Sequence, residues 1–307
     1  MSKLTLCLFC LCICAIFGTG CYIGDKQMTE AEIETISPTK VITDLNSDYP
    51  ISNTFVDPRQ FASLKSAPIL LPKGWAVAGV VNHHALAMNL QTEFFTTLKM
   101  IRPDIKTFVI LSPDHYLKHK GVSISAVDYA TPAGVVQVSK KWVDELIKFG
   151  VFDGTKDRLF EKEHGVGALV PFIARDFPDA QIVPVIIYQT LPLDQAQKLG
   201  AEISSLSDDK TFIIISADMS HYLNDVEARR NDELMMSWLK NADWKKLKMA
   251  NDGYTDSKVS FAVLETYLTA QKISAKFVQI EHAVSTDYGA DPNNTTSYIT
   301  GMYLAVR

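Results

Sequence analysis

Short apolar runs rich in β-branched residues recur along the chain after about residue 70, and they restrict the fold more than any other feature. In TFIIIS at 211–216 and VPVII at 183–187, apolar residues follow one another without alternating with polar ones. Such runs indicate strands that are covered on both faces, because a strand with one wet face alternates. Strands are predicted at residues 76–81, 107–111, 121–126, 181–188, 211–216, 276–280 and 297–306.

Segments with helical periodicity separate these runs. Within residues 257–271, for example, Phe261, Leu264 and Leu268 recur at the spacing of one helix face. Helices are predicted at residues 88–101, 139–149, 165–175, 193–205, 224–239 and 257–271. The alternation predicts an α/β fold with a central, mostly parallel or mixed sheet and helices on both faces. No compositional break divides the chain after residue 70, so a single α/β domain is expected over residues 51–307.

The N-terminus has the pattern of an export signal. Lys3 precedes an apolar run over residues 4–17, and the small residues GTG precede Cys21. This order is typical of a secretory signal peptide, and the run is short for a permanent membrane span. Because small residues directly before a cysteine resemble a bacterial lipobox, residues 1–21 are predicted to be a signal peptide with lipidation at Cys21. An ordinary signal peptide or an uncleaved anchor is the alternative.

Residues 22–50 are polar and lack apolar periodicity, which is typical of a tether. With a lipidated Cys21, they predict an exported protein anchored to a membrane of the bacterial cell envelope. All five cysteines lie within the first 21 residues, so the rest of the chain has no disulfide, thiolate metal site or cysteine nucleophile. The net charge of −5 provides no basic surface for a nucleic-acid partner.

Histidines follow three of the predicted strands. His83 and His84 come after the run at 76–81, His115 after that at 107–111, and His221 after that at 211–216. In open α/β sheets, ligands bind beyond the carboxyl ends of the strands. Neutral imidazoles bind zinc, iron and copper, and neighbouring carboxylates orient the ligands or complete the set. The pattern therefore predicts a site for a divalent metal ion at one edge of the sheet.

Four further residues are candidates for lining this site or for acid–base chemistry. His164 begins the predicted helix at 165–175, and His282 follows the strand at 276–280. Asp114 directly precedes His115, and Asp218 lies three residues before His221. A histidine or carboxylate within hydrogen-bond reach of a bound ligand can act as a general acid or base. Asp218 could instead only cap the turn after its strand.

The order of these segments resembles the Memo family, whose prokaryotic members are called AmmeMemoRadiSam system protein B. The similarity covers residues 74–307, and its most specific parts are SPDH at 112–115 and SADMSH at 216–221, with EKEH at 161–164 and SYITG at 297–301. The resemblance implies a fold similar to that of class III extradiol dioxygenases, which hold non-haem iron at this edge of the sheet.

The resemblance also implies a ligand set. Three histidines line the metal pocket in the Memo family, and the matching residues here are His83, His115 and His221. The first match has an alternative, because Asn82 occupies the place of the family's proline and His84-Ala85 matches its His-Ala pair. His164 matches a Glu-His pair that lines the pocket, and Asp218 matches an aspartate that orients His221 or binds a ligand. Extradiol enzymes use two histidines and one carboxylate, and a set of three histidines departs from that.

The resemblance to the Memo family also implies a cysteine near the pocket, in a Cys-Gly segment before the last predicted helix. The corresponding segment here is GYTDS at 253–257, which assigns the thiol position to Thr255 and excludes a cysteine-based redox role. The expected function is that of a membrane-tethered protein whose histidine-rich pocket holds iron, zinc or copper. Two uses of the pocket are compatible with the sequence: a metal-dependent oxidoreductase or hydrolase of a small molecule, or a non-catalytic module that binds metal or peptide. An exported chain does not meet a cytosolic radical-SAM enzyme, so no direct complex with one is expected.

Overall fold

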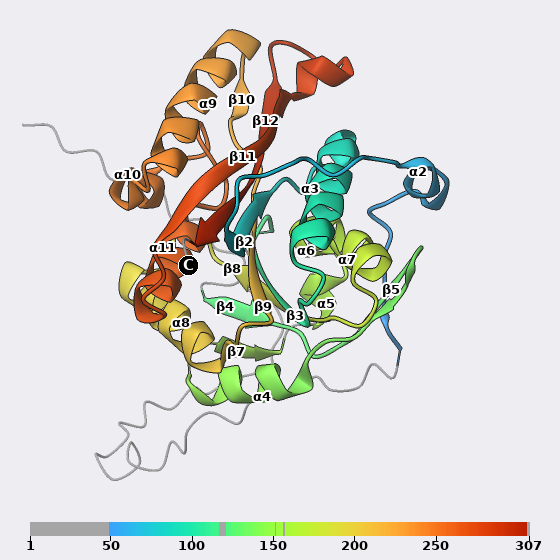
Figure 1. Cartoon of the computed structure of the whole chain (residues 1–307), viewed down its shortest axis with the longest axis vertical. Helices are drawn as coiled ribbons and strands as arrows, with labels where there is room; N and C mark the ends of the chain where they lie inside the picture. The colour runs from blue at the N-terminus through green and yellow to red at the C-terminus, as the bar shows by residue number, and fades with distance from the viewer. Residues whose placement is uncertain (1–48, 117–120, 151, 156, 306–307) are drawn as a thin grey trace, which may run out of the picture. The chain divides into compact units, whose positions relative to one another are not determined.

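The computed structural model describes residues 49–305 except 117–120, 151 and 156 (Figure 1). The predicted signal peptide, Cys21 and all but the last two residues of the predicted tether at 22–50 lie outside the described residues. Within the described part, the helices are too short or too polar to cross a membrane.

A mixed sheet of nine strands forms the centre of the fold. Eight strands follow the order β10-β12-β2-β9-β3-β8-β4-β7, and β11 pairs with β12. The central strands β2, β9, β3 and β8 are parallel, whereas β12 runs antiparallel to β2 and β4 runs antiparallel to β8. The bounds are β2 Trp75–Val81, β3 Thr107–Pro113, β4 Val122–Ile124, β7 Phe152–Thr155, β8 Gln181–Ile187, β9 Thr211–Ser216, β10 His221–Leu223, β11 Ala275–Val284 and β12 Thr295–Ala305.

Helices cover both faces of this sheet, as the doubly apolar strands require. Every residue of β9 is buried. One face carries α3, α6 and α7, and the other carries α8 and α11 (Figure 1). The bounds are α3 Met88–Ile101, α4 Lys140–Lys148, α5 Asp157–Phe160, α6 His164–Gly167, α7 Val170–Asp176, α8 Leu193–Leu206, α9 Asp225–Lys240, α10 Trp244–Met249 and α11 Lys258–Ala270. The predicted α/β fold with a mixed sheet is confirmed.

Several short elements were not predicted. A second sheet has three strands in the order β1-β5-β6. Its strands and the remaining short helices are β1 Ile51–Ser52, β5 Tyr129–Thr131, β6 Gly134–Val136, α2 Pro58–Ser63, η1 Ala85–Ala87 and η2 Ser285–Tyr288. The single helix predicted at 165–175 is wrong, because the chain breaks there into α6 and α7. Pro171 occupies the first turn of α7, where its missing N–H is not needed.

The carboxyl ends of three central strands lie level with one another. Val81 of β2 is paired with Ser216 of β9, and Leu111 of β3 is paired with Ile215 of β9. The residues that follow these strands therefore leave the sheet at the same edge, which we call the carboxyl edge. The opposite edge, where Trp75 begins β2 and Thr211 begins β9, is called the amino edge.

Candidate metal centre

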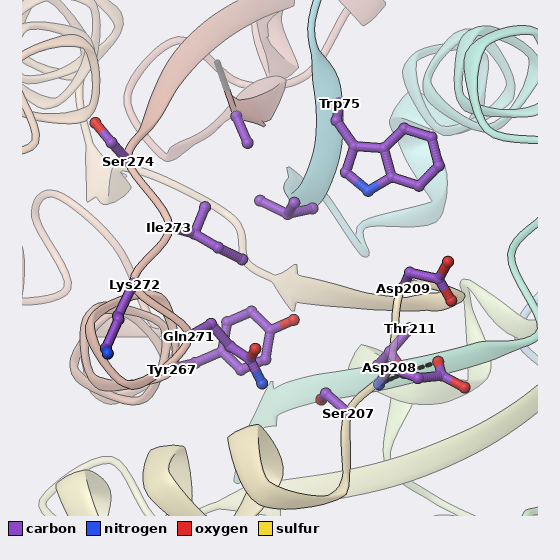
Figure 2. A pocket seen from close by; sticks show the side chains of 12 residues that line it. Trp75, Ser207, Asp208, Asp209, Thr211, Tyr267, Gln271, Lys272, Ile273 and Ser274 are labelled. Atoms are coloured by element: carbon purple, nitrogen blue, oxygen red, sulfur yellow. Dashed lines mark hydrogen bonds between the residues drawn. The ribbon is translucent and has the colours of Figure 1, made fainter. Parts of the chain in front are cut away.

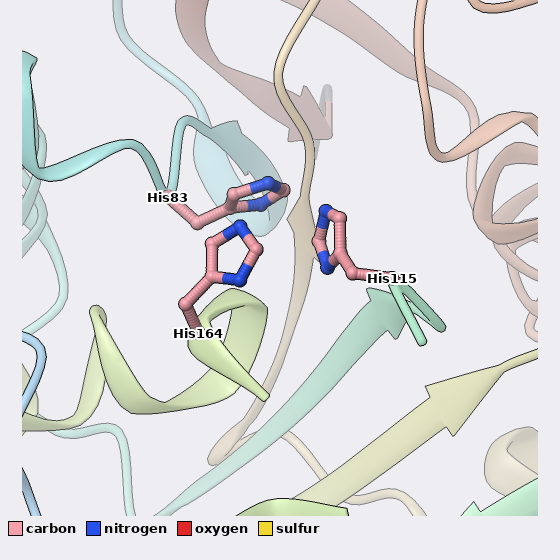
Figure 3. A group of neighbouring side chains, drawn as sticks. All are labelled: His83, His115 and His164. Carbon is pink, nitrogen blue, oxygen red and sulfur yellow. The ribbon is translucent and has the colours of Figure 1, made fainter. Parts of the chain in front are cut away.

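Three histidines meet at the carboxyl edge. His83 follows β2, His115 follows β3 and His164 begins α6, and Figure 3 shows their rings converging from these three elements. One ring nitrogen of each lies within 4.8 Å of those of the other two. The ring centres of His115 and His164 are 4.0 Å apart. Among the described residues this group contains His83 and His115, as predicted for the ligands, together with His164, which was predicted to line the pocket, and it does not contain His221.

The first turn of α6 is fixed to the end of β3 by Glu163. This fully buried carboxylate caps the helix by accepting the main-chain N–H of Gly165 at 2.9 Å, and it accepts that of His115 at 3.1 Å. Residue 165 has to be glycine for this approach, because a Cβ there would lie 2.2 Å from Ser112 Oγ. Glu163 and Gly165 therefore place His164 beside His115.

The hydrogen bonds around His83 determine which ring nitrogen is free. His83 Nδ1 lies 2.9 Å from Ser216 Oγ, and that hydroxyl donates its only proton to the main-chain oxygen of Gly165. Ser216 Oγ must therefore accept a hydrogen bond from the N–H at His83 Nδ1. In the neutral ring this assignment leaves the lone pair on His83 Nε2, the nitrogen that can bind a metal ion.

His115 is oriented in the same way by a carboxylate. Its Nδ1 donates to Glu163 Oε1 at 2.6 Å, so in the neutral ring the lone pair is on Nε2. A carboxylate that accepts from the second nitrogen of a histidine is a common arrangement behind metal-binding histidines. Burial alone would raise the pKa of Glu163, but its bond to His115 holds that pKa below the ordinary value.

A buried carboxylate faces both free nitrogens. Asp256 Oδ2 lies 3.2 Å from His83 Nε2 and 3.5 Å from His115 Nε2, which is within ion-pair distance but without hydrogen-bond geometry. Neither Asp256 oxygen nor His83 Nε2 has a hydrogen-bond partner among the described residues. Two ring nitrogens and a carboxylate thus converge without a hydrogen bond between them, an arrangement that needs positive charge, either protons on the rings or a bound cation.

The pKa values express the same need for positive charge. Burial would raise the pKa of Asp256, but the neighbouring charge of His83 and the contact with His115 hold it below its ordinary value. Burial would lower the pKa of His115, but Asp256 and Glu163 outweigh burial and raise that pKa to about 10. His164 differs, because burial and the charges of His83 and His115 lower its pKa to about 4. Its side chain is 38% exposed, so the centre meets solvent on the side of His164.

Two other predicted residues support the turn after β2. Asp218 Oδ1 accepts the main-chain N–H of His83 at 3.0 Å and that of His84 at 3.4 Å. The ring of His84, the alternative ligand, points elsewhere, because its Nδ1 lies 2.7 Å from the hydroxyl of Tyr298. Asp218 therefore fixes the backbone that presents His83.

The remaining predicted residues have partners of their own. His221 Nδ1 lies 2.6 Å from the main-chain oxygen of Met219, and His282 Nε2 lies 2.8 Å from the buried carboxylate of Asp232. Asp114 accepts the main-chain N–H of Tyr116. Thr255, which the family resemblance places at the thiol position, donates its hydroxyl to the main-chain oxygen of Asp218.

Sequence reasoning missed the roles of Asp256, Glu163 and Ser216. Glu163 directly precedes His164, and Asp256 directly follows Thr255 in the segment that corresponds to the family's cysteine. Sequence reasoning considered only Thr255 of the Thr255-Asp256 pair, and it therefore missed the neighbouring carboxylate. Nothing local in the sequence marks Ser216 as the partner of His83, because that contact joins the ends of two strands 133 residues apart.

A cavity of about 360 Å³ lies at the amino edge, away from the three histidines. Trp75 and Tyr267 line it together with Asp208 and Asp209 (Figure 2). The cavity therefore shares the sheet with the metal centre but none of its residues.

Residues 77–302 match the family described as Memo-like protein. A MEMO1 family protein of Caldivirga maquilingensis is 28% identical over 232 residues, which are 73% of this chain and 78% of the relative. One from Archaeoglobus fulgidus is 31% identical over 147 residues, covering 47% of this chain and 55% of the relative. The crystal structure of an uncharacterized protein from Escherichia coli K12 is similar in fold, with a TM-score of 0.50 and 15% identity, and covers 73% of this chain and 99% of its own.

Proposed function

Because the chain belongs to the Memo-like protein family, we propose that it is a metal-binding protein that holds one divalent ion at the carboxyl edge. The convergence of His83, His115 and His164 carries this proposal, since each contributes one nitrogen within 4.8 Å of the others. The protons on His83 and His115 are fixed by Ser216 and Glu163, so the free nitrogens are already ordered before an ion arrives. Imidazole nitrogens suit iron, zinc and copper.

A bound ion would supply a Lewis acid, and iron or copper would also supply redox chemistry. The residues of the chain hold the ion from the sheet side, and the half-exposed His164 leaves the other side accessible to a small molecule or a peptide. With a pKa of about 4, His164 is neutral at pH 7 and has a lone pair to offer to the ion or to a ligand beside it.

Metal binding is tested on the tag-free full-length protein. We expect about one equivalent of Fe²⁺ (loaded without oxygen), Zn²⁺ or Cu²⁺ per chain by elemental analysis. Metal at a hundredfold excess over Kd adds about 2.7 kcal/mol to the unfolding free energy, so a chelator should lower the melting temperature. His115→Ala should abolish this difference. Substoichiometric binding of all three ions, with equal melting with and without chelator, would contradict the proposal.

The use of the ion is a finer proposal. We propose oxidation–reduction or hydrolysis of a small molecule, which is supported by the solvent-accessible side of the centre at His164. A non-catalytic module that binds metal or peptide at the same place is the alternative, supported by the lack of cysteine after residue 21. Turnover screening with Fe²⁺, Zn²⁺ and Cu²⁺ separates the two. Metal-dependent turnover that falls in His164→Gln supports the enzyme, and ligand binding without turnover supports the module.

The cellular location is proposed from the sequence. Lys3, the apolar run at 4–17 and the small residues before Cys21 support export and a lipid anchor in the bacterial cell envelope. Such a location separates the chain from cytosolic radical-SAM enzymes. Cys21→Ser should move the protein out of the membrane fraction, and the extracted wild-type protein should contain no free thiol. A titratable thiol in the wild type, or an unchanged membrane fraction in the variant, would contradict lipidation.

A further inference from the structure

We propose that Asp256, and not His164, is the third protein ligand, so that two histidines and one carboxylate hold the metal ion. The buried Asp256 carboxylate faces the Nε2 atoms of both His83 and His115, and this inference is based on that arrangement. The inference rests on the proposed metal binding and adds the identity of the donor set to it.

The two distances from the Asp256 carboxylate suit ligands of one ion. Nitrogen and oxygen donors lie at about 2.0–2.2 Å from such a metal, so neighbouring donors are separated by about 2.8–3.6 Å at angles of roughly 90 to 110 degrees. Asp256 Oδ2 is 3.2 Å from His83 Nε2 and 3.5 Å from His115 Nε2. Both distances fall within that range without movement of any side chain.

A cation explains this arrangement better than a proton does. A proton on each Nε2 would give both rings an ion pair with Asp256 Oδ2, but neither contact has hydrogen-bond geometry. A divalent ion contacts all three, and the carboxylate offsets part of its charge inside the protein. The side chains of His83 and Asp256 are 1% and 6% exposed, so water is poorly placed to perform this role.

His164 does not have the same need for a partner. Its ring is 38% exposed and can be solvated on its own, whereas Asp256 is buried with both oxygens unpaired among the described residues. A buried carboxylate without hydrogen bonds is more costly than a partly exposed neutral imidazole. The carboxylate therefore has the stronger requirement for the ion, and His164 remains unligated on the solvent side.

The loop before α11 is built to present Asp256. Its main-chain N–H donates to the main-chain oxygen of Asp218 at 3.3 Å, and the hydroxyl of Thr255 donates to the same oxygen at 3.1 Å. Thr255 Oγ1 also accepts the main-chain N–H of Ser257 at 3.2 Å. Because Asp218 also holds the backbone of His83, one aspartate ties the loop of Asp256 to the loop of His83.

The carboxylate also indicates which metal the site favours. Two imidazoles with one carboxylate are the donor set of non-haem Fe(II) sites, whereas a thiolate in this loop would favour softer ions. The same donor set also holds catalytic zinc, so a chain that has Thr255-Asp256 here, and cysteine only before residue 22, is expected to hold Fe²⁺ or Zn²⁺ rather than softer ions.

Crossed variants test the donor set, with Co²⁺ as the spectroscopic probe and Fe²⁺ competition under anaerobic conditions. Asp256→Asn should weaken Co²⁺ binding by on the order of a hundredfold or more, because a charged ligand is lost. His164→Gln should bind within about threefold of the wild type. Asp252→Asn is the matched control, because it removes an exposed carboxylate from the same loop and should bind as the wild type does.

The outcomes separate this inference from the proposed function. Normal binding by Asp256→Asn, or a comparable loss in His164→Gln, would overturn the carboxylate assignment while leaving metal binding intact. A wild-type protein that binds no metal would instead contradict the proposed function. If Asp256→Asn does not fold by far-UV circular dichroism, pulsed EPR of Cu²⁺-loaded wild-type protein still counts the bound imidazoles. Two imidazoles support the inference, and three overturn it.

Discussion

Charged side chains are buried at both edges of the central sheet, but the two edges differ in whether these side chains have hydrogen-bond partners. At the amino edge, the side chain of Arg102 is 1% exposed and every one of its nitrogens has a partner. Nε donates to Asp104 at 2.9 Å, Nη2 donates to Asp104 and to the main-chain oxygen of Asp209, and Nη1 donates to that of Ala76. The guanidinium also stacks on Trp75, 3.7 Å from the ring centre.

At the carboxyl edge, the buried Asp256 and the Nε2 atoms of His83 and His115 face one another without a hydrogen bond. This sheet can therefore give a buried charge hydrogen-bond partners for all of its polar atoms. It does so at Arg102, which stabilises the fold and lies away from the three histidines. The set without hydrogen bonds at the carboxyl edge is the place where we propose that an ion binds. The comparison predicts that the amino edge determines stability and the carboxyl edge determines metal binding.

The largest expected effect is on stability at the amino edge. Arg102→Met removes a buried cation and leaves Asp104 and two main-chain oxygens without their donor, so the free energy of unfolding should fall by about 3–5 kcal/mol. Denaturant unfolding measures this loss, which should be the same with and without metal. Lys106→Ala, which removes an exposed cation 3.5 Å from Asp179, should cost less than about 1 kcal/mol. A loss confined to the metal-loaded form would break the comparison.

At the carboxyl edge, Glu163→Gln should act on metal affinity. The substitution keeps the shape of the side chain but removes the charge behind His115, so the Kd for the metal ion should rise about 10- to 100-fold. Glu161→Gln, an exposed residue two positions earlier, is the control and should bind as the wild type does. The measurement is competition with a chromophoric chelator. Equal affinities in the two variants would show that the bond between Glu163 and His115 does not orient a ligand.

The two edges should also respond to opposite ends of the pH scale in the metal-free protein. The hydrogen bond from Arg102 lowers the pKa of Asp104 below 3.8, so its contribution is present above that pH and is lost as the pH falls through the lower folded value. The folded pKa of His115 is raised from 6.5 to about 10 against the opposing effect of burial, so its contribution is present below 6.5 and is lost as the pH rises toward 10.

Melting temperatures of the chelated protein should therefore decline between pH 6.5 and 10, and Asp256→Asn should make that decline shallower, since Asp256 is one of the two carboxylates that raise this pKa. Melting that is independent of pH over this range would show that the carboxyl edge is not held by protonated histidine in the absence of metal.

Long elements of this fold could be predicted because their patterns are local. The helix predicted at 88–101 coincides with α3, and TFIIIS at 211–216 coincides with β9. The strands of the second sheet have two or three residues each, too few for a pattern, and their pairing depends on contacts between residues 51 and 129. Strand ends could be predicted as well, which is why His83 and His115 were expected at the same edge.

The third donor could not be deduced from the sequence. It depends on how the loop before α11 reaches Asp218, and that contact spans 38 residues of sequence between Asp218 and Asp256. The predicted helix at 165–175 also concealed the break after Gly167. Long-range contacts of this kind determine side-chain direction, and residue type and spacing alone do not contain them.

The smallest expected effect distinguishes the two neighbouring histidines after β2. His84 Nδ1 lies 2.7 Å from the hydroxyl of Tyr298, while His83 Nε2 faces Asp256, so only His83 is placed to bind the ion. His84→Gln and Tyr298→Phe should each lower the free energy of unfolding by about 0.5–1.5 kcal/mol, because each removes one partner of that hydrogen bond. Both variants should keep the metal affinity of the wild type within about threefold, because the bond lies outside the donor set. A loss of affinity in His84→Gln that Tyr298→Phe does not share would instead identify His84, and not His83, as the ligand that follows β2.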